Sequence, residues 1–228
     1  MFSIIIPLFN EEKNIKNLLN EIFMILQNQE NFEVVLVDDK STDKTLELIS
    51  NYKKNNIKIL QNTINKGQSY SIHKGIRYSL YNIIVTLDGD GQNDPADIYK
   101  LLNLYKSDER IKLVGGIRIK RKDNLIKIVS SRIANTIRSR LLKDNCRDTG
   151  CSLKVFDKKI FLKFPYFDGI HRFLPALFKG FGHKTKFVNV NHRERKYGIS
   201  KYGTMNRLFK GIIDLVKVFK ILKMSSVK

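Results

Sequence analysis

At residues 85–95 the chain reads Val85-Thr86-Leu87-Asp88-Gly89-Asp90-Gly91-Gln92-Asn93-Asp94-Pro95. The stretch ends an apolar strand, expected over residues 83–87, and then places Asp88 and Asp90 at the carboxyl end of that strand. Alternate residues of an extended segment point the same way, so the two carboxylates can converge on one point. Hard oxygen ligands of this kind suit Mg²⁺ or Mn²⁺, and Gln92 can add a neutral oxygen. The stretch therefore predicts a metal site, and the alternative is an ordinary acidic turn.

The residues between and after these acids are suited to a turn from strand to helix. Gly89 and Gly91 allow a tight bend and the close approach of a ligand. Asp94 and Pro95 resemble a helix N-cap followed by Pro at the first helical position, which predicts a helix over residues 96–105.

Upstream of this stretch, short apolar runs alternate with helical patterns that carry one apolar face. The expected strands are residues 4–6 (ended by Pro7), 32–39, 57–60 and 83–87, and the expected helices are one capped by Asn10 and those over residues 45–52 and 69–80. This alternation predicts an α/β fold with a doubly wound, mostly parallel sheet flanked by helices. Such sheets bind ligands outside the carboxyl ends of their strands. Residues 7–11, 38–39 and 88–90 all fall at that edge.

Downstream of Pro95 the pattern is less regular and more basic. The expected elements are a strand over residues 111–115, a helix over 126–141, strands ending at Phe156 and Asn191, a Phe-rich segment over 164–182 and a basic loop over 192–203. The chain has neither a dinucleotide-binding glycine fingerprint nor a P-loop.

Length and composition indicate one soluble globular domain with a substantial core. The chain has 228 residues, of which 42% are hydrophobic. It has no apolar run of about 18 residues and no basic, apolar leader, so we expect neither a transmembrane helix nor a signal peptide. This pattern predicts a cytoplasmic protein in which Cys146 and Cys151 are free thiols.

The charge is strongly basic and unevenly distributed. Forty-two Lys and Arg against 22 Asp and Glu give a net charge of +20, and the excess lies after residue 110. Such a field attracts nucleic acid, anionic membranes or phosphorylated substrates. A single-stranded nucleic-acid binder interleaves stacking aromatic residues with its cations. Only Tyr197 and Tyr202 do so here, and that function leaves the acidic strand ends unexplained, so we do not expect a nucleic-acid partner.

The last residues form a pattern of their own. Residues 205–223 alternate apolar side chains with Lys and Arg at helical spacing, which predicts a basic amphipathic helix. Such a helix can lie in the interface of an anionic membrane. The alternative is a terminal helix packed on the core with a solvated basic face.

In order, these motifs resemble those of the family 2 glycosyltransferases, and within them the polyprenyl-phosphate sugar transferases, such as dolichol-phosphate mannosyltransferase and its bacterial relatives. The matching segments are Ser3–Glu12, Val37–Asp43, Asn65-Lys66-Gly67, Asp88–Pro95, Gly116-Ile117-Arg118, Arg132, Asp148–Cys151 and His192–Lys201. The resemblance covers about residues 2–203. It implies a single GT-A-type domain over residues 1–203, followed by the amphipathic helix of residues 204–228.

The resemblance implies inverting, metal-dependent transfer of a sugar from a GDP- or UDP-linked donor to an undecaprenyl or dolichyl phosphate, in cell-envelope synthesis. The implied catalytic residues are Asp90, Arg118 and Arg132, and the implied metal ligands are Asp88, Asp90 and Gln92 with Mg²⁺ or Mn²⁺. The implied donor-binding residues are Pro7, Phe9, Glu11, Val37, Asp39, Asp88, Gly89, Asp90, Gln92, Arg195 and Lys201. Arg132 and Arg193 are implied to bind the acceptor, although Arg193 and Arg195 are interchangeable because the late basic loop aligns ambiguously.

The chain departs from the family pattern at three places. Phe9 replaces the usual Tyr and so removes a hydroxyl, and Lys40 replaces the usual Gly after Asp39. Many relatives also carry transmembrane helices near the C-terminus, which this sequence lacks. A separate membrane protein is therefore an expected partner, and the expected location is peripheral, on the cytoplasmic face of the membrane.

The nature of the acceptor decides whether a general base is needed. A phosphate monoester is already anionic at neutral pH, so the protein has only to neutralise the leaving group and align the acceptor. An acceptor hydroxyl, as in polysaccharide synthesis, needs a positioned carboxylate, for which Asp168 is the candidate. His171 and Arg172 are candidate contacts to the acceptor phosphate or the donor; alternatively, both face solvent at the start of a helix.

Overall fold

The computed structural model describes residues 1–29, 31–119, 136, 138–195 and 204–225. Its elements are β1 Phe2–Leu8, α1 Ile15–Ile25, β2 Phe32–Asp38, α2 Thr45–Ser50, β3 Ile57–Gln61, α3 Gln68–Tyr78, β4 Ile83–Thr86, α4 Asp97–Lys106, β5 Ile111–Arg118, β6 Lys154–Asp157, α6 Lys158–Phe161, α7 Ile170–Gly180, β7 Lys184–Val190 and α8 Thr204–Ser225. Most of the expected 126–141 helix and the end of the basic loop lie outside the described residues.

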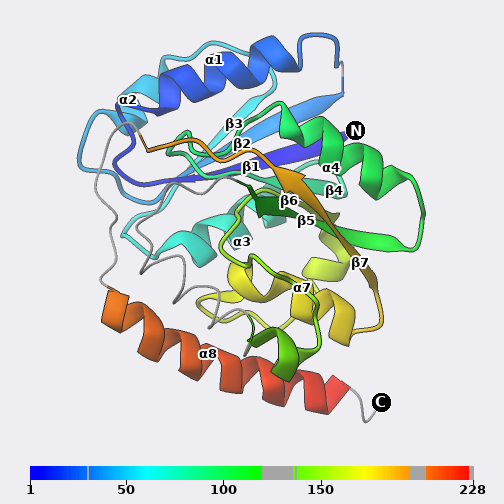
Figure 1. Cartoon of the computed structure of the whole chain (residues 1–228). Helices are drawn as coiled ribbons and strands as arrows, with labels where there is room; N and C mark the ends of the chain where they lie inside the picture. The colour runs from blue at the N-terminus through cyan, green and yellow to red at the C-terminus, as the bar shows by residue number, and fades with distance from the viewer. Residues whose placement is uncertain (30, 120–135, 137, 196–203, 226–228) are drawn as a thin grey trace.

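One seven-stranded sheet runs through the molecule in the order β3-β2-β1-β4-β6-β5-β7 (Figure 1). The first four strands are parallel, and so is the β5–β7 pair, whereas β6 runs antiparallel to both β4 and β5. The predicted α/β fold with a mostly parallel sheet is therefore confirmed. The antiparallel β6 has one important effect, because its first residue, Lys154, pairs with Thr86 at the carboxyl end of β4.

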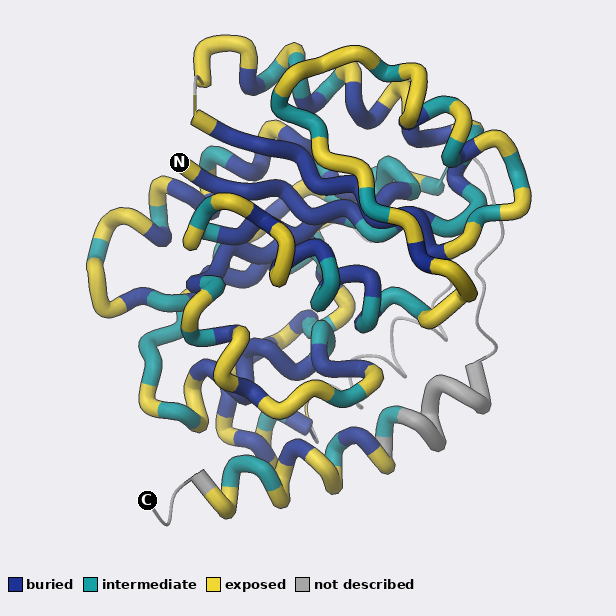
Figure 2. Tube along the Cα trace, turned by 180° about the vertical axis from the view of Figure 1, so that it is seen from behind, coloured by how far each residue is buried: buried dark blue, intermediate teal, exposed yellow. Residues whose placement is uncertain are grey.

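Helices cover both faces of the sheet. α1, α2 and α4 lie on one face and bury an apolar core against β1 and β2, whereas α3, α6, α7 and α8 lie on the other face around a Phe-rich core (Figure 1). The Phe-rich segment predicted over residues 164–182 supplies much of this second core, including Phe164, Phe173 and Phe178. The central strands are almost wholly buried, as Figure 2 shows. Burial of both faces explains why these strands are continuously apolar.

Two predicted boundaries are wrong near the amino-terminal loops. Pro7 does not end β1, which continues to Leu8 beside β2. β4 pairs with β1 only at Ser3–Ile5, so the missing N–H of Pro7 faces no ladder partner on that side. Asn10 does not cap α1, which begins at Ile15; instead, its side chain accepts a 2.8 Å hydrogen bond from the backbone N–H of Thr42.

The boundary after the acidic stretch is also displaced. α4 begins at Asp97 rather than Ala96, and Asp94 precedes its first residue by three positions. Asp94 Oδ1 accepts the Ala96 N–H at 3.1 Å, so the Asp-Pro pair makes a turn ahead of the helix. The N-cap prediction is therefore wrong by about one half-turn, although the helix itself is present.

A terminal helix is present where the sequence predicts one. α8 packs on α7, and its Asp214 and Val218 are buried in this contact. The division of the chain at residues 203 and 204 stays a prediction, since residues 196–203 are not described. No helix in the described part of the chain is long and apolar enough to span a bilayer.

Candidate active site

The predicted acidic loop follows β4 at the carboxyl edge of the sheet. Gly91 has a φ of 73°, a left-handed conformation that favours Gly. Gly89 is required for a different reason, because a Cβ there would lie 2.4 Å from Leu8 Cδ2. The loop therefore packs against the end of β1, where Pro7 and Phe9 are half-buried. Both glycines keep the turn tight and hold the acids at the edge of the sheet.

The two carboxylates of the loop act on each other. Burial, followed by the neighbouring charge of Asp90, raises the pKa of Asp88 to about 6, against the opposing effects of Ser152, Lys154 and Arg118. Asp88 Oδ1 accepts a 2.8 Å hydrogen bond from Gln68 Nε2, at the start of α3. Two carboxylates that repel each other in a partly buried loop are a favourable place for a cation.

Asp90 also faces a cationic side chain from the end of the sequence. Arg195 NH2 lies 3.8 Å from Asp90 Oδ2 and donates a 3.1 Å hydrogen bond to Glu11 Oε1. Glu11 is buried, and its other oxygen accepts from Asn14 Nδ2 at 2.8 Å. Three residues that the sequence predicts to bind the donor, Glu11, Asp90 and Arg195, therefore meet at one place although they lie far apart in the sequence.

The basic loop after β7 is docked on the acidic loop through main-chain contacts. Arg193 N donates to Gln92 O at 2.9 Å, and Asn93 and His192 form an isolated bridge. The side chain of Gln92 is turned toward this loop, with Nε2 3.3 Å from Arg193 O and 3.4 Å from His192 Nε2. Its backbone N–H donates to Asp90 Oδ1 at 3.1 Å. Metal ligation by Gln92 stays a prediction.

The carboxylates of Asp88 and Asp90 fit a hard divalent cation only if substrate oxygens supply further ligands. Among residues 1–29, 31–119 and the later described segments, no group of three or more His, Cys, Asp or Glu side chains converges as a metal site. Asp88 and Asp90 provide carboxylate oxygens, which suit Mg²⁺ or Mn²⁺. Mg²⁺ is commonly held by one or two carboxylates together with substrate phosphates. The pair therefore fits a cation bound together with a diphosphate.

Asp39 organises a neighbouring loop. Its Oδ1 accepts from Asn62 Nδ2 at 2.7 Å and from Lys66 N at 2.9 Å, and its Oδ2 accepts from Gly67 N at 2.7 Å. Gly67 immediately precedes Gln68, the residue that holds Asp88. Asp39 thus connects the end of β2 to the acidic loop through the start of α3. Its predicted contact with the nucleotide base or ribose stays a prediction.

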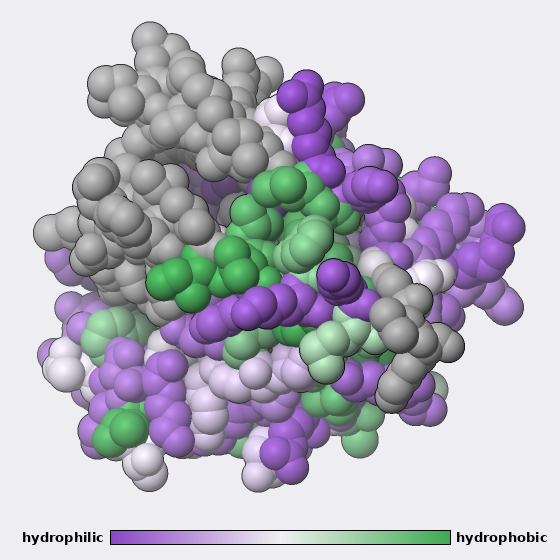
Figure 3. All heavy atoms as spheres, turned by 90° about the horizontal axis from the view of Figure 1, so that it is seen from below, coloured by the Kyte–Doolittle hydropathy of each residue, from purple (hydrophilic) through white to green (hydrophobic). Residues whose placement is uncertain are grey.

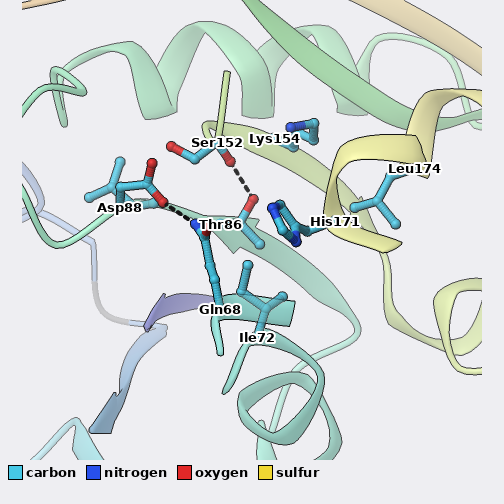
Figure 4. Close-up of a pocket in the computed structure, with 9 residues that line it drawn as sticks. Gln68, Ile72, Thr86, Asp88, Ser152, Lys154, His171 and Leu174 are labelled. Carbon is cyan, nitrogen blue, oxygen red and sulfur yellow. Dashed lines mark hydrogen bonds between the residues drawn. The ribbon is translucent and has the colours of Figure 1, made fainter. Parts of the chain in front are cut away.

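A small pocket, whose empty space of about 270 Å³ includes open solvent, lies beside Asp88 (Figure 4). Its walls come from α3, β4, the start of β6 and α7: Gln68, Ile72, Thr86, Leu87, Asp88, Ser152, Lys154, His171 and Leu174. Thr86 Oγ1 donates to Ser152 O at 2.6 Å, which closes one side. His171 Nδ1 lies 2.7 Å from Ser69 Oγ, which also accepts the Gly169 N–H at 2.7 Å. Of the two alternatives for His171, the structure therefore supports a pocket residue.

Three other predicted arginines are engaged in ion pairs away from Asp90. Arg118 forms a two-pronged pair with Asp148, with both N–O distances 2.8 Å. Arg193 pairs with Glu21 at 2.6 Å and with Asp94 at 3.0 Å. Arg172 pairs with the buried Asp214 of α8 at 2.6 Å.

These positions separate Arg195, which faces Asp90, from Arg193, which does not. The other predicted residues are less informative. Val37 is completely buried in the core beneath α3. Arg132 and Lys201 lie outside the described residues.

Sequence reasoning missed three polar side chains of this site. Gln68 follows the predicted Asn65-Lys66-Gly67 loop directly, so its place at the start of α3 was a usable signal. Lys154 lies within the apolar run Leu153–Phe156, which is an unusual position for a charge. Asn93 lies within the acidic stretch, and its Oδ1 accepts from Ser152 Oγ at 2.6 Å. Asn93 thereby connects the acidic loop to β6.

A family model described as "Glycosyl transferase family 2" matches residues 3–164. The chain belongs to this family. The match includes both acids of the acidic loop, Asp39 and the start of β6.

Among curated proteins, this family 2 chain is 32% identical over 228 residues to a dodecaprenyl-phosphate galacturonate synthase of Rhizobium johnstonii. It is 31% identical over 218 residues to an undecaprenyl-phosphate 4-deoxy-4-formamido-L-arabinose transferase of Yersinia pestis. The two alignments cover 97% and 94% of this chain. The chain spans about two thirds of the length of these relatives, at 67% and 66%.

Solved structures with the same fold confirm the expected GT-A-type architecture for this family 2 chain. Glucosyl-3-phosphoglycerate synthase from Mycobacterium tuberculosis, crystallised with Mn²⁺, UDP-glucose and phosphoglyceric acid, superposes with a TM-score of 0.74 at 16% identity. That alignment covers 96% of this chain and 80% of the other. A complex of the same enzyme with Mg²⁺ and UDP gives a TM-score of 0.72 at 15% identity, with 94% and 79% covered.

Proposed function

We propose that this chain is an inverting, metal-dependent glycosyltransferase that transfers a sugar from a nucleotide-sugar donor to a polyprenyl phosphate. Its family membership supports glycosyl transfer, and both curated relatives are named for products or substrates on polyprenyl phosphates. The structural neighbours were crystallised with UDP and Mg²⁺ or with UDP-glucose and Mn²⁺, which supports a nucleotide-sugar donor and a divalent cation.

One observation favours a phosphate acceptor over a saccharide hydroxyl. Of the described residues that line the pocket, only Asp88 carries a carboxylate, and Asp88 belongs to the proposed metal pair. A hydroxyl acceptor needs a base within hydrogen-bond reach. Asp168, the candidate base, is exposed and does not line the pocket. A phosphate monoester, whose second pKa is about 6, needs no base at neutral pH.

The roles of the residues follow from this arrangement. Asp88 and Asp90 would hold the cation, which supplies Lewis-acid stabilisation of the diphosphate leaving group. Arg195, held by Glu11 beside Asp90, adds a planar cation suited to phosphate oxygens. The pocket beside Asp88 would receive a reacting group of one substrate, from the transferred sugar or from the attacking phosphate. A single in-line displacement, with no covalent intermediate on the protein, inverts the anomeric carbon.

A donor screen tests this function. The full chain is incubated with UDP- and GDP-sugars, Mn²⁺ or Mg²⁺, and undecaprenyl phosphate, and the lipid product is identified by mass and by the configuration of its anomeric carbon. Asp90→Ala abolishes the product, whereas Asp108→Ala, which removes a carboxylate from a surface ion pair, leaves it unchanged. Transfer to a neutral saccharide but not to the lipid phosphate would favour the alternative, a polysaccharide-forming family 2 enzyme.

We further propose that α8 rests on an anionic membrane surface, with the enzyme on the cytoplasmic face. Asp214 and Val218 dock this helix on α7, while Ile213, Val216 and Phe219 are 57%, 51% and 53% exposed. Lys217, Lys220 and Lys223 share the exposed side, and Figure 3 shows an apolar patch bordered by hydrophilic side chains. Exposed apolar residues interleaved with lysines suit the boundary between headgroups and acyl chains.

Vesicle co-sedimentation tests this membrane contact. The wild type pellets with phosphatidylglycerol-containing vesicles more than with phosphatidylcholine alone, and Val216→Ser with Phe219→Ser reduces pelleting. Met24→Ser, on the exposed side of α1, is the matched control. Equal pelleting of all three proteins would contradict the contact. A separate membrane protein as partner remains part of the proposal, and co-purification of such a protein from the native membrane tests it.

A further inference from the structure

Lys154 is a buried cation whose ammonium group has one hydrogen-bond acceptor among the described residues. It is only 3% exposed, and Cys151 O is the hydrogen-bond acceptor of its Nζ. Within the described part of the chain, no carboxylate lies within ion-pair distance of Nζ. An ammonium group has three donors, and a buried charge is costly unless it is paired. The protein therefore keeps a charged donor in its interior with part of its bonding capacity unused.

The position of Lys154 indicates which group could use the remaining hydrogen bonds of its ammonium. β6 runs antiparallel to β4 and pairs Lys154 with Thr86, two residues before the metal carboxylate Asp88. Lys154 lines the pocket together with Ser152 and His171. In Figure 4, Asp88 and His171 lie on opposite sides of this pocket, and Lys154 lies beside Ser152 along its wall. The cation thus belongs to the pocket rather than to the sheet alone.

The imidazole of His171, on another wall of the pocket, is held in a fixed orientation. Ser69 Oγ lies 2.7 Å from His171 Nδ1 and 2.7 Å from the Gly169 N–H that it accepts, so α3 and the start of α7 hold the imidazole. The pocket is small and partly open, and its empty space of about 270 Å³ includes open solvent. It is too small for a whole nucleotide, so the group that binds here is a small part of a substrate.

We propose that Lys154, with His171 beside it, forms an oxyanion-binding subsite next to the metal pair. The subsite takes an anionic group carried by one of the two substrates: a carboxylate on the transferred sugar or the phosphate of the acceptor. This inference rests on the proposed transferase function and specifies the charge of the substrate group that occupies the pocket. The subsite binds and positions this group, and no covalent step is assigned to Lys154.

Donor binding tests the first source of the oxyanion. Mn²⁺-dependent binding of UDP-glucuronate and UDP-glucose, which differ at C6, is measured by calorimetry, together with GDP-mannuronate and GDP-mannose. If the anion is a sugar carboxylate, Lys154→Met weakens binding of the matching uronate donor by about 30-fold or more. The neutral donor and the free nucleoside diphosphate keep their affinities.

Acceptor kinetics test the second source. If the anion is the acceptor phosphate, Lys154→Met raises the KM for undecaprenyl phosphate by a similar factor with every donor, and all nucleotide affinities stay unchanged. Lys158→Met is the matched control, because Lys158 lies on α6 outside the pocket and donates to Ser79 O at 2.5 Å. His171→Gln removes the ionisable imidazole and shows the same substrate dependence to a smaller extent, which keeps the test available if Lys154→Met does not fold.

Two results overturn the subsite, and they differ from failure of the function itself. If Lys154→Met and His171→Gln leave all donor affinities and the acceptor KM unchanged, no oxyanion binds there. If Lys154→Met weakens free UDP, GDP and every donor equally, Lys154 serves only to balance the charge of the metal carboxylates. Failure of the wild type to bind any nucleotide with Mn²⁺ refutes the transferase proposal and this inference together.

Discussion

Gln68 donates a 2.8 Å hydrogen bond from Nε2 to Oδ1 of Asp88, so the first residue of α3 orients a carboxylate that follows β4. Removal of a residue that orients a metal ligand typically costs 10–100-fold in metal affinity. We expect Gln68→Ala to weaken Mn²⁺ binding about 10-fold, measured by titration in the presence of UDP. Gln61→Ala, at the exposed end of β3, is the control and changes nothing. Equal affinities of the Gln68 variant and the wild type would contradict this role.

The raised pKa of Asp88 makes metal binding dependent on pH. Burial and the charge of Asp90 hold this pKa at about 6, so below that pH a proton must leave before the carboxylate can bind a cation. We expect the apparent Kd for Mn²⁺ to rise about tenfold per pH unit below pH 6 and to be nearly constant from pH 7 to 8. Calorimetry at fixed ionic strength measures it. Constant affinity from pH 5 to 8 would show that Asp88 is not a ligand.

Lys40 occupies a backbone conformation that is unfavourable for a side chain. Its φ is 63°, at the position where the family pattern has Gly. The left-handed conformation costs roughly 1–2 kcal/mol for a non-Gly residue, partly offset by the greater freedom of Gly in the unfolded chain. We expect Lys40→Gly to raise the free energy of unfolding by about 0.5 kcal/mol in urea. Lys44→Gly, at a φ of −78°, lowers it instead.

An ion pair joins α7 and α8 at their contact. Asp214 is 1% exposed, and its Oδ2 lies 2.6 Å from Arg172 NH2, which is 30% exposed. Arg172→Ala leaves a buried carboxylate without this partner and lowers the free energy of unfolding by about 2 kcal/mol, less than for a fully buried pair. Replacing both residues by Leu recovers most of the loss. Arg110→Ala, in a surface pair, changes stability by less than about 0.5 kcal/mol.

The sequence was sufficient to predict the parallel half of the sheet and the acids at its edge. β1, β2 and β4 are mostly apolar runs, and Asp39 and Asp88 mark the carboxyl ends of β2 and β4. The antiparallel direction of β6 was not predictable, because strand direction depends on pairing between residues far apart in the chain, as for Thr86 and Lys154. Local patterns carry no information about such pairs.

The same limit applies to the arginines of the site. Arg193 and Arg195 are two residues apart in one basic loop, and no property of that loop distinguishes them. The difference arises from residues early in the chain, because Glu11 forms an ion pair with Arg195 and Glu21 forms one with Arg193. Lys154 was recognisable as a charge in an apolar strand, but its role became visible only with the pocket that it lines.

His171 and Arg172 are consecutive residues in the first turn of α7, yet their side chains make contacts in different parts of the molecule. The imidazole lines the pocket, and the guanidinium holds α8 through Asp214. Two consecutive residues therefore connect the pocket beside Asp88 to α8, the helix that we propose rests on lipid. A shift of this turn would move the pocket imidazole and the ion pair to α8 together, whereas replacing either side chain alone changes only one of these two contacts.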